Sequence, residues 1–393
     1  AIAPQEPLGR KAALWALDDD VARLEQDAAQ TLNTALGHLR HAVELQPDHA
    51  AARRALADWY WIRFLDAEWR GRVDEAYFYR QLVEEYHDGR LARLLEGSAR
   101  LSLTTVPGDA RVTVRRFVET EHRLQPAAEA WSGASPVREL ALHMGSYLVS
   151  LERPGSRPVR VPLFLRRAEH ARLSVPLLPD EAIGAGFVYV PPGGFIAGGD
   201  PAAEKSLPKT WVHLDGFVLG RTSITCGEYL AFINELAATD LDQARRRTPR
   251  TGREAGYYWP CVADRFEIPE RDKDGDAWRT DFPVFGVSFD DALAYCAWRS
   301  ARDCLPWRLP TELEWEKAAR GADGRLYPWG NRFDPTFAKM RHTRPGRPQP
   351  EPVDGFPIDE SPYGVRDTAG TIRNWCDSRW PAGEQYRVIK GGA

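Results

Sequence analysis

The stretch Phe282–Asn331, FPVFGVSFDDALAYCAWRSARDCLPWRLPTELEWEKAARGADGRLYPWGN, decides how the C-terminal half of this chain folds. Two hydroxyl residues in it are each followed three positions later by an acid, Ser288 by Asp291 and Thr311 by Glu314. In such a capping box the hydroxyl accepts a backbone N–H inside the helix, and the acid accepts the N–H of the capping residue. The pattern therefore predicts two short helices within irregular chain that is rich in tryptophan.

The segments before this stretch predict strands and one more helix. Gly186–Gly199, GFVYVPPGGFIAGG, places alternating aromatic residues around two prolines and predicts a strand, a tight turn and a returning strand. Val212–Leu236, VHLDGFVLGRTSITCGEYLAFINEL, predicts a strand that enters a helix, because Thr225 and Glu228 again have capping-box spacing.

The first part of the chain changes its periodicity near residue 99. Leu14–Ser98 has apolar residues at helical spacing, and Pro47 divides it into a helical hairpin in which Asp48 can cap the second helix. Between residues 99 and 180, apolar and polar residues alternate between Pro-Gly and Gly-Asp turn signals, which predicts short antiparallel strands. We expect a helical region over 1–98, a small all-β domain over 99–180 and an α+β domain over 181–393.

Composition and charge narrow the class of protein. The 393 residues are 43% hydrophobic and 27% charged, as in an ordinary globular protein. We expect no membrane association, because no stretch approaches the ~18 consecutive apolar residues of a membrane span. The net charge of -4 offers no general attraction for nucleic acid, so we expect no nucleic-acid partner either.

The five cysteines are scattered and contain no CxxC pair. Metal-binding cysteines usually come in close pairs, so we expect these thiols to be reduced and mostly buried. Reduced thiols are typical of the cytoplasm, which is the expected location. The cysteines are Cys226, Cys261, Cys296, Cys304 and Cys376.

Three blocks together carry a resemblance to a known family: Phe282–Asn331, then Ser361–Trp380 (SPYGVRDTAGTIRNWCDSRW), then Arg387–Ala393 (RVIKGGA). In order and spacing they resemble the formylglycine-generating enzyme family, also called sulfatase-modifying factors. The resemblance covers roughly 183–393. It implies a C-type-lectin-like fold with few strands, two helices and much irregular chain held together by buried aromatic side chains.

The resemblance also implies where catalysis would reside. True formylglycine-generating enzymes bind copper through two cysteines that follow an RGGSW-like motif, and here KGGA stands at that motif, at residues 390–393. None of the five cysteines present matches the catalytic pair, so we expect a domain truncated at its C-terminus and no catalytic residue within this span. The related iron-dependent sulfoxide synthases carry an HxxxHxE motif that the N-terminal helices here lack.

The family's calcium sites can be transferred residue by residue. One surrounds a stretch that is DTAGTIRNW here, so the resemblance implies metal ligands at Asp367, Gly370, Ile372 and Asn374. Asn374 replaces the family's glutamate, whereas Asp367 adds a carboxylate, so calcium binding there stays open. The second site has Lys339 where the family has asparagine, and we expect that site to be absent.

Two shorter resemblances concern the regions before this domain. AVELQPDHAAARRALADWY, residues 42–60, resembles a tetratricopeptide repeat, a helical pair that stacks in arrays. VPGDARVTV and MGSYLVSLERPG resemble the two halves of a PEGA-type β module, which usually acts as a spacer. Met340–Pro350, MRHTRPGRPQP, predicts a basic surface loop whose arginines can meet a phosphate or an acidic partner.

These resemblances leave three hypotheses about function. The first is a non-catalytic ligand- or protein-binding module of a bacterial signalling or defence protein, associated with a kinase domain in some relatives and bound to a protein or peptide partner. The second is the variable ligand-binding protein of a diversity-generating retroelement. The third is a copper-dependent oxidase of peptide cysteines, whose own cysteines would lie beyond residue 393. Oligomeric state does not follow from the sequence.

Overall fold

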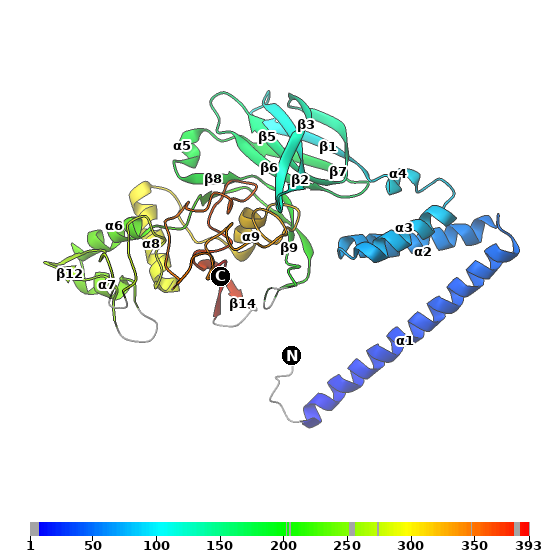
Figure 1. Cartoon of the computed structure of the whole chain (residues 1–393), viewed down its shortest axis with the longest axis horizontal. Coiled ribbons are helices and arrows are strands. Elements are labelled where there is room, and N and C mark those ends of the chain that lie inside the picture. The colour runs from blue at the N-terminus through cyan, green and yellow to red at the C-terminus, as the bar shows by residue number, and fades with distance from the viewer. Residues whose placement is uncertain are drawn as a thin grey trace. The chain divides into compact units, whose positions relative to one another are not determined.

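The computed structural model describes residues 8–201, 203, 206–250, 256–272, 275–346, 348–380 and 386–392. The chain divides into two compact units, Ala1–Ser98 and Ala99–Ala393, drawn in blue and in cyan to red in Figure 1. Among the described helices, none combines the length and the apolar character that crossing a membrane requires.

The first unit is helical, as predicted. Its helices are α1 (Leu8–Leu45), α2 (Ala50–Trp69), α3 (Val73–Tyr86) and α4 (Ala92–Leu95). Pro47 does separate α1 from α2, but the prediction that Asp48 caps α2 is wrong. The cap is His49, whose Nδ1 accepts the backbone N–H of Ala52 at 3.2 Å. A histidine nitrogen can replace the usual hydroxyl or carboxylate oxygen because it offers the same in-plane lone pair at the same reach.

The core of this unit lies where the three long helices meet. Leu56 and Tyr60 of α2 and Val83 of α3 are buried, and from α1 only the C-terminal part contributes, through Leu36. Tyr60 also accepts hydrogen bonds from Arg40 at 2.8 and 3.0 Å.

The second unit begins with two facing β-sheets. Its first strands are β1 (Ser98–Val106), β2 (Arg111–Thr120), β3 (Arg123–Ala134), β4 (Val137–His143), β5 (Gly145–Glu152), β6 (Val159–Leu165) and β7 (His170–Pro176). One sheet has the order β4-β1-β7 and the other β3-β2-β5-β6. Alternate residues of both sheets, such as Leu101, Val112 and Val149, are fully buried in one core. The inner faces of the two sheets therefore pack together as in a β-sandwich.

The predicted pairing of these strands is partly wrong. β2, β5 and β6 pair antiparallel as expected. However, β1 lies in the other sheet and runs parallel to β7, with Arg100 opposite His170. Alternation shows that a segment is extended, but which strand it pairs with depends on contacts between segments distant in sequence.

The remaining chain is a loop-rich α+β domain, as expected. Its elements are α5 (Asp180–Ile183), β8 (Phe187–Val190), β9 (Gly193–Ala197), β10 (Thr210–Leu214), β11 (Phe217–Gly220), α6 (Cys226–Ala237), α7 (Leu241–Arg247), β12 (Cys261–Val262), β13 (Arg265–Phe266), α8 (Phe289–Asp303), α9 (Glu312–Arg320), β14 (Asn374–Trp380) and β15 (Tyr386–Lys390). The capping boxes at the starts of α6, α8 and α9 are all confirmed.

The expected hairpin over Gly186–Gly199 is wrong in its pairing. Its two strands exist, but β8 pairs with β11 and β9 pairs with β10. The connection between them is held by the buried Lys317 of α9, whose Nζ donates to the carbonyls of Pro191 and Gly193 at 2.8 and 3.1 Å. Lys317 lies 126 residues after Pro191 and 124 after Gly193, so a helix distant in sequence holds this connection.

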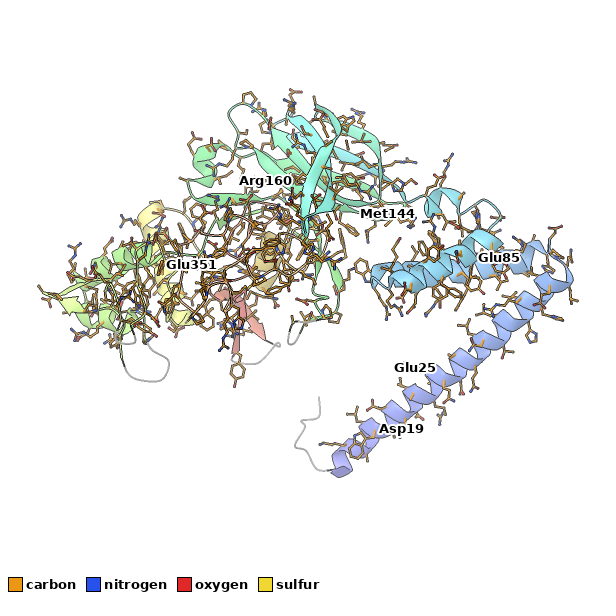
Figure 2. The ribbon with its side chains drawn as sticks, in the orientation of Figure 1. Asp19, Glu25, Glu85, Met144, Arg160 and Glu351 are labelled. Carbon is orange, nitrogen blue, oxygen red and sulfur yellow. The ribbon has the colours of Figure 1, made fainter. Side chains whose placement is uncertain are left out.

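The sandwich and the loop-rich domain form one unit with shared contacts. Arg160 of β6 bonds Glu360 at 2.7 Å, and the backbone N–H of Leu124 donates to the carbonyl of Trp329 at 2.7 Å. Arg160 lies at this junction in Figure 2. Aromatic side chains fill the interior between α6 and α8, where Tyr229 and Tyr295 stack at 5.7 Å.

Candidate functional site

A cavity of about 1310 Å³ lies within the loop-rich domain. Its lining includes residues of α5, β8, β11, α6, α8, α9, β14 and β15 and of the loops between them. The capping boxes explain how these walls are placed, since they fix the starts of α8 and α9 and so direct Tyr295, Cys296 and Trp315 to the lining.

Three tryptophans contribute to the wall, and neighbouring groups hold each of them. The indole N–H of Trp315 donates to the Asn374 amide oxygen at 3.1 Å, and that of Trp375 donates to the Val287 carbonyl at 3.1 Å. Trp307 meets Phe187 edge to face at 5.1 Å. The indole N–H groups of Trp315 and Trp375 are thus satisfied by the protein, and ring contacts hold Trp307, so the three rings present apolar, preorganised surface to a ligand.

The cavity carries more positive than negative charge. Arg308 forms two hydrogen bonds to Glu314, at 2.7 and 2.6 Å. Burial alone would raise the pKa of Glu314, but these bonds and those from Thr311 outweigh it and lower the pKa. Because the two charges of this ion pair cancel, the net charge of the cavity lining is set by its other residues.

Two lining arginines have no such partner. Arg341 and Arg373 are exposed, and neither forms a hydrogen bond or ion pair with any described residue. Arg341 belongs to the basic loop whose arginines, by the sequence prediction, can meet a phosphate or an acidic partner. Among the described lining residues, the carboxylates are those of Glu314 and Asp276. The free guanidinium groups therefore favour an anionic ligand.

The four predicted calcium ligands lie along the loop that leads into β14. Asp367 is 2% exposed, and its carboxylate accepts the backbone N–H of Asp354 at 2.7 Å. The amide of Asn374 is engaged with Trp315 and with the Ser223 hydroxyl at 3.1 Å. Ile372 lines the cavity. Calcium binding by Asp367, Gly370, Ile372 and Asn374 stays a prediction; over the described ranges, no group of three or more His, Cys, Asp or Glu residues could hold a metal.

Close backbone packing explains the glycine of this loop. A Cβ added at Gly370 would lie 2.0 Å from the carbonyl oxygen of Lys339, and that same carbonyl accepts the N–H of Thr371 at 2.8 Å. Lys339, where the second calcium site was expected to be lost, is buried, and its Nζ donates to the Met340 carbonyl at 3.1 Å.

Asp359 organises this loop, and the sequence did not point to it. The side chain is fully buried, and both carboxylate oxygens accept the backbone N–H of Ala369 at 3.2 Å. Burial, with a smaller contribution from the nearby Asp367 carboxylate, raises the pKa of Asp359 to about 7 despite the opposing hydrogen bonds from backbone N–H groups. Nothing in the surrounding FPIDESP has a pattern that marks a buried acid, so only the folded loop reveals it.

Comparison with known proteins places this domain in a family. Residues 177–393 match the family described as sulfatase-modifying factor enzyme 1-like domain. The chain belongs to the sulfatase-modifying factor family. The resemblance inferred from the three sequence blocks is therefore confirmed.

Named relatives of this sulfatase-modifying factor domain include proteins with and without stated activity. An inactive C-alpha-formylglycine-generating enzyme 2 from Bos taurus is 36% identical over 52% of this chain and 75% of that protein. A formylglycine-generating enzyme from Thermomonospora curvata is 29% identical over 53% of this chain and 76% of its own length. A hercynine oxygenase from Mycolicibacterium smegmatis is 31% identical, and the match spans 52% of this chain and 53% of that enzyme. Family membership alone does not decide whether this chain is a catalyst.

The metals associated with sulfatase-modifying factor enzymes, copper and iron, do not fit the described residues. The copper site that the family resemblance implies uses two cysteine thiolates, whereas the described residues of the cavity lining include one cysteine, Cys296, and no histidine. Burial raises the pKa of Cys296 to about 11 and that of Cys226 and Cys376 to about 12, so these thiols stay protonated at neutral pH. All five cysteines are free: these three are buried as predicted, Cys261 is partly buried and Cys304 is exposed.

Proposed function

We propose that this chain is a non-catalytic binding protein, and that its cavity holds an extended acidic peptide segment of a protein partner. The single observation that carries the proposal is the combination of aromatic walls with two unpaired arginines, Arg341 and Arg373, in one cavity.

The size of the cavity supports a peptide over a small metabolite. Pockets for drug-sized ligands usually occupy about 300–1,000 Å³, whereas this one reaches about 1310 Å³. Its apolar walls, including Trp307, Trp315 and Trp375, suit the apolar side chains of a peptide. Its arginines suit carboxylates, which they can bind through two parallel hydrogen bonds.

The protonation of the cysteine thiols supports binding rather than catalysis. The thiolate is the form that acts as nucleophile and metal ligand, and burial disfavours it at Cys226, Cys296 and Cys376. The similarity to the enzyme from Thermomonospora curvata keeps a copper-dependent oxidase as the second candidate. That activity would require thiolates other than these, and the retroelement hypothesis has no observation of its own in its favour.

The regions ahead of the cavity fit supporting roles. The α2–α3 pair is one helical hairpin of the kind found in tetratricopeptide repeats, and the two-sheet region fits a PEGA-like spacer. We propose that both present the cavity-bearing domain rather than contribute chemistry.

Peptide binding to the full chain tests the proposal. The probes are two fluorescently labelled peptides of about ten residues, one alternating Leu with Glu and the other Leu with Lys, measured by fluorescence anisotropy. We expect the acidic peptide to bind at least about tenfold more tightly, because it can pair with both free arginines. The double variant Arg341→Ala, Arg373→Ala should lose this preference.

The matched control removes two exposed arginines that do not line the cavity, Arg245→Ala and Arg246→Ala on α7. The control should keep the preference for the acidic peptide. Equal binding of both peptides to the wild-type chain, or an equal loss in the control, would contradict the proposed site. Oxidation of a cysteine-containing peptide by the copper-loaded chain would instead favour the oxidase.

A further inference from the structure

From Ala12 to Ala35, α1 packs against no other described helix of the first unit. Every residue from Ala12 to Ala35 is exposed, over a length of about 36 Å. α2 and α3 pack on α1 only from Leu36 onward. Figure 1 shows α1 diverging from α2 and α3 toward its N-terminal end.

This exposed helix nevertheless carries an apolar stripe. Leu14, Leu17, Val21 and Leu24 follow alternating spacings of three and four residues, and the pattern continues through Ala28. These four side chains are 43–62% exposed. Such spacing places them on one face, in the arrangement by which a helix packs against a second helix in a coiled coil.

The stripe is bordered by carboxylates on both sides. Asp18 and Glu25 flank one edge, and Asp20 and Asp27 flank the other, at the positions that form ion pairs across a coiled coil. Arg23 is the one basic residue between positions 12 and 35; it lies on the opposite side of the helix and bonds Asp20 at 2.8 Å. The border of the stripe is therefore acidic.

The acidic border disfavours a second copy of this chain. In a parallel pair, Asp20 of one helix would face Glu25 of the other, and in an antiparallel pair each edge would face an identical acidic edge. Like charges at these positions repel, and one helix with this pattern discriminates among partners by charge. A partner with Lys or Arg at the same positions would turn each repulsion into an attraction.

We propose that α1 is a docking helix for a basic amphipathic helix of a protein partner, which buries the stripe Leu14, Leu17, Val21 and Leu24. This surface is separate from the cavity, and the two sites select opposite charges. A negative result in the test of one site therefore does not contradict the proposal for the other site.

The test uses the full chain and two labelled helical peptides of about four heptads, with Leu at the core positions and either Lys or Glu at the flanking positions. Fluorescence anisotropy should show at least about tenfold tighter binding of the Lys peptide at low salt, and the difference should shrink as salt is added. Reversing all four flanking charges, with Asp18, Asp20, Glu25 and Asp27 each changed to Lys, should invert the preference. Far-UV circular dichroism verifies that α1 remains helical.

A matched pair of single charge reversals locates the surface. Glu25→Lys borders the stripe, whereas Asp19→Lys lies on the opposite side of the same helix, and both residues are marked on α1 in Figure 2. We expect Glu25→Lys to weaken Lys-peptide binding about threefold and Asp19→Lys to change it by less than about twofold.

Three results would overturn the proposal. The first is equal binding of both peptides, or equal effects of the two single reversals. The second is a dimer in sedimentation velocity that Leu17→Gln with Leu24→Gln disperses, since the occupant would then be a second copy. The third is displacement of the Lys peptide by neutral phosphatidylcholine vesicles, together with loss of vesicle binding in the variant Leu17→Gln, Leu24→Gln. The occupant of the stripe would then be a lipid surface.

Discussion

At the scale of single residues, the loop before β14 depends on one buried acid. The carboxylate of Asp359 accepts the backbone N–H of Ala369 in this loop. Because Asp359 is fully buried, water solvates its negative charge poorly. Because its pKa is raised to about 7 in the folded chain, against 3.8 for an ordinary aspartate, the folded state binds a proton that the unfolded state releases. The contribution of Asp359 to stability is thus complete below about pH 4 and is lost as the pH rises through 7.

Asp359→Asn should remove this pH dependence. The free energy of unfolding of the wild-type chain should fall relative to that of the variant between pH 4 and pH 8, by about 2–4 kcal/mol. Urea unfolding at the two pH values measures the difference. Asp242→Asn, an exposed acid on α7, is the control and should follow the wild-type curve; a parallel curve for Asp359→Asn would refute the role assigned to the buried proton.

At the scale of elements, α9 is attached to the β8–β9 connection by Lys317. Lys317 is 1% exposed, and its amine donates to two backbone carbonyls, those of Pro191 and Gly193. Burial lowers the pKa of Lys317 to about 8, so the folded chain releases a proton that the unfolded chain keeps up to about pH 10. Between these pH values, the contribution of Lys317 to the free energy of unfolding must rise with pH.

Lys317→Met should therefore act in two ways. At pH 7 it leaves two buried carbonyls without a donor, at a cost of about 1–3 kcal/mol. Between pH 8 and 10 the variant should lack the upward slope that Lys317 gives to the wild-type curve. Thermal or urea unfolding across this range measures both effects, and a variant curve that stays parallel to the wild-type curve throughout would show that Lys317 does not titrate as assigned.

At the scale of the whole second unit, Glu360 joins the sandwich to the loop-rich domain. It accepts from Arg160 of β6 at 2.7 Å and from Arg366 of the loop region at 2.8 Å, and its side chain is 24% exposed. Burial would raise its pKa, but these two guanidinium groups outweigh that effect and lower it. Half-buried pairs of this kind contribute more than isolated surface pairs because water screens them less.

Glu360→Gln should destabilise the unit by about 1 kcal/mol, because the carboxylate charge is lost and one of its two oxygens becomes an amide NH2 group that cannot accept from a guanidinium. The control Glu235→Gln removes the partner of Arg302 on an exposed surface, where the side chain is 57% exposed, and should cost less than about 0.5 kcal/mol. Urea unfolding of the two variants provides the comparison. Equal costs would mean that the junction is no stronger than a surface ion pair.

The sequence by itself determined the local elements and the family of this protein. The capping boxes at Thr225, Ser288 and Thr311, the helical first region and the alternating strands depend on neighbours within a few residues, and those neighbours are visible in the chain. Tertiary structure decided the strand partners, the cap at His49, the buried Asp359 and the union of Arg341 with Arg373 in one cavity. Each of these features depends on burial or on contacts between segments that are distant in sequence. Local sequence patterns do not predict such contacts, because the packing energy arises among residues that meet only in the folded chain.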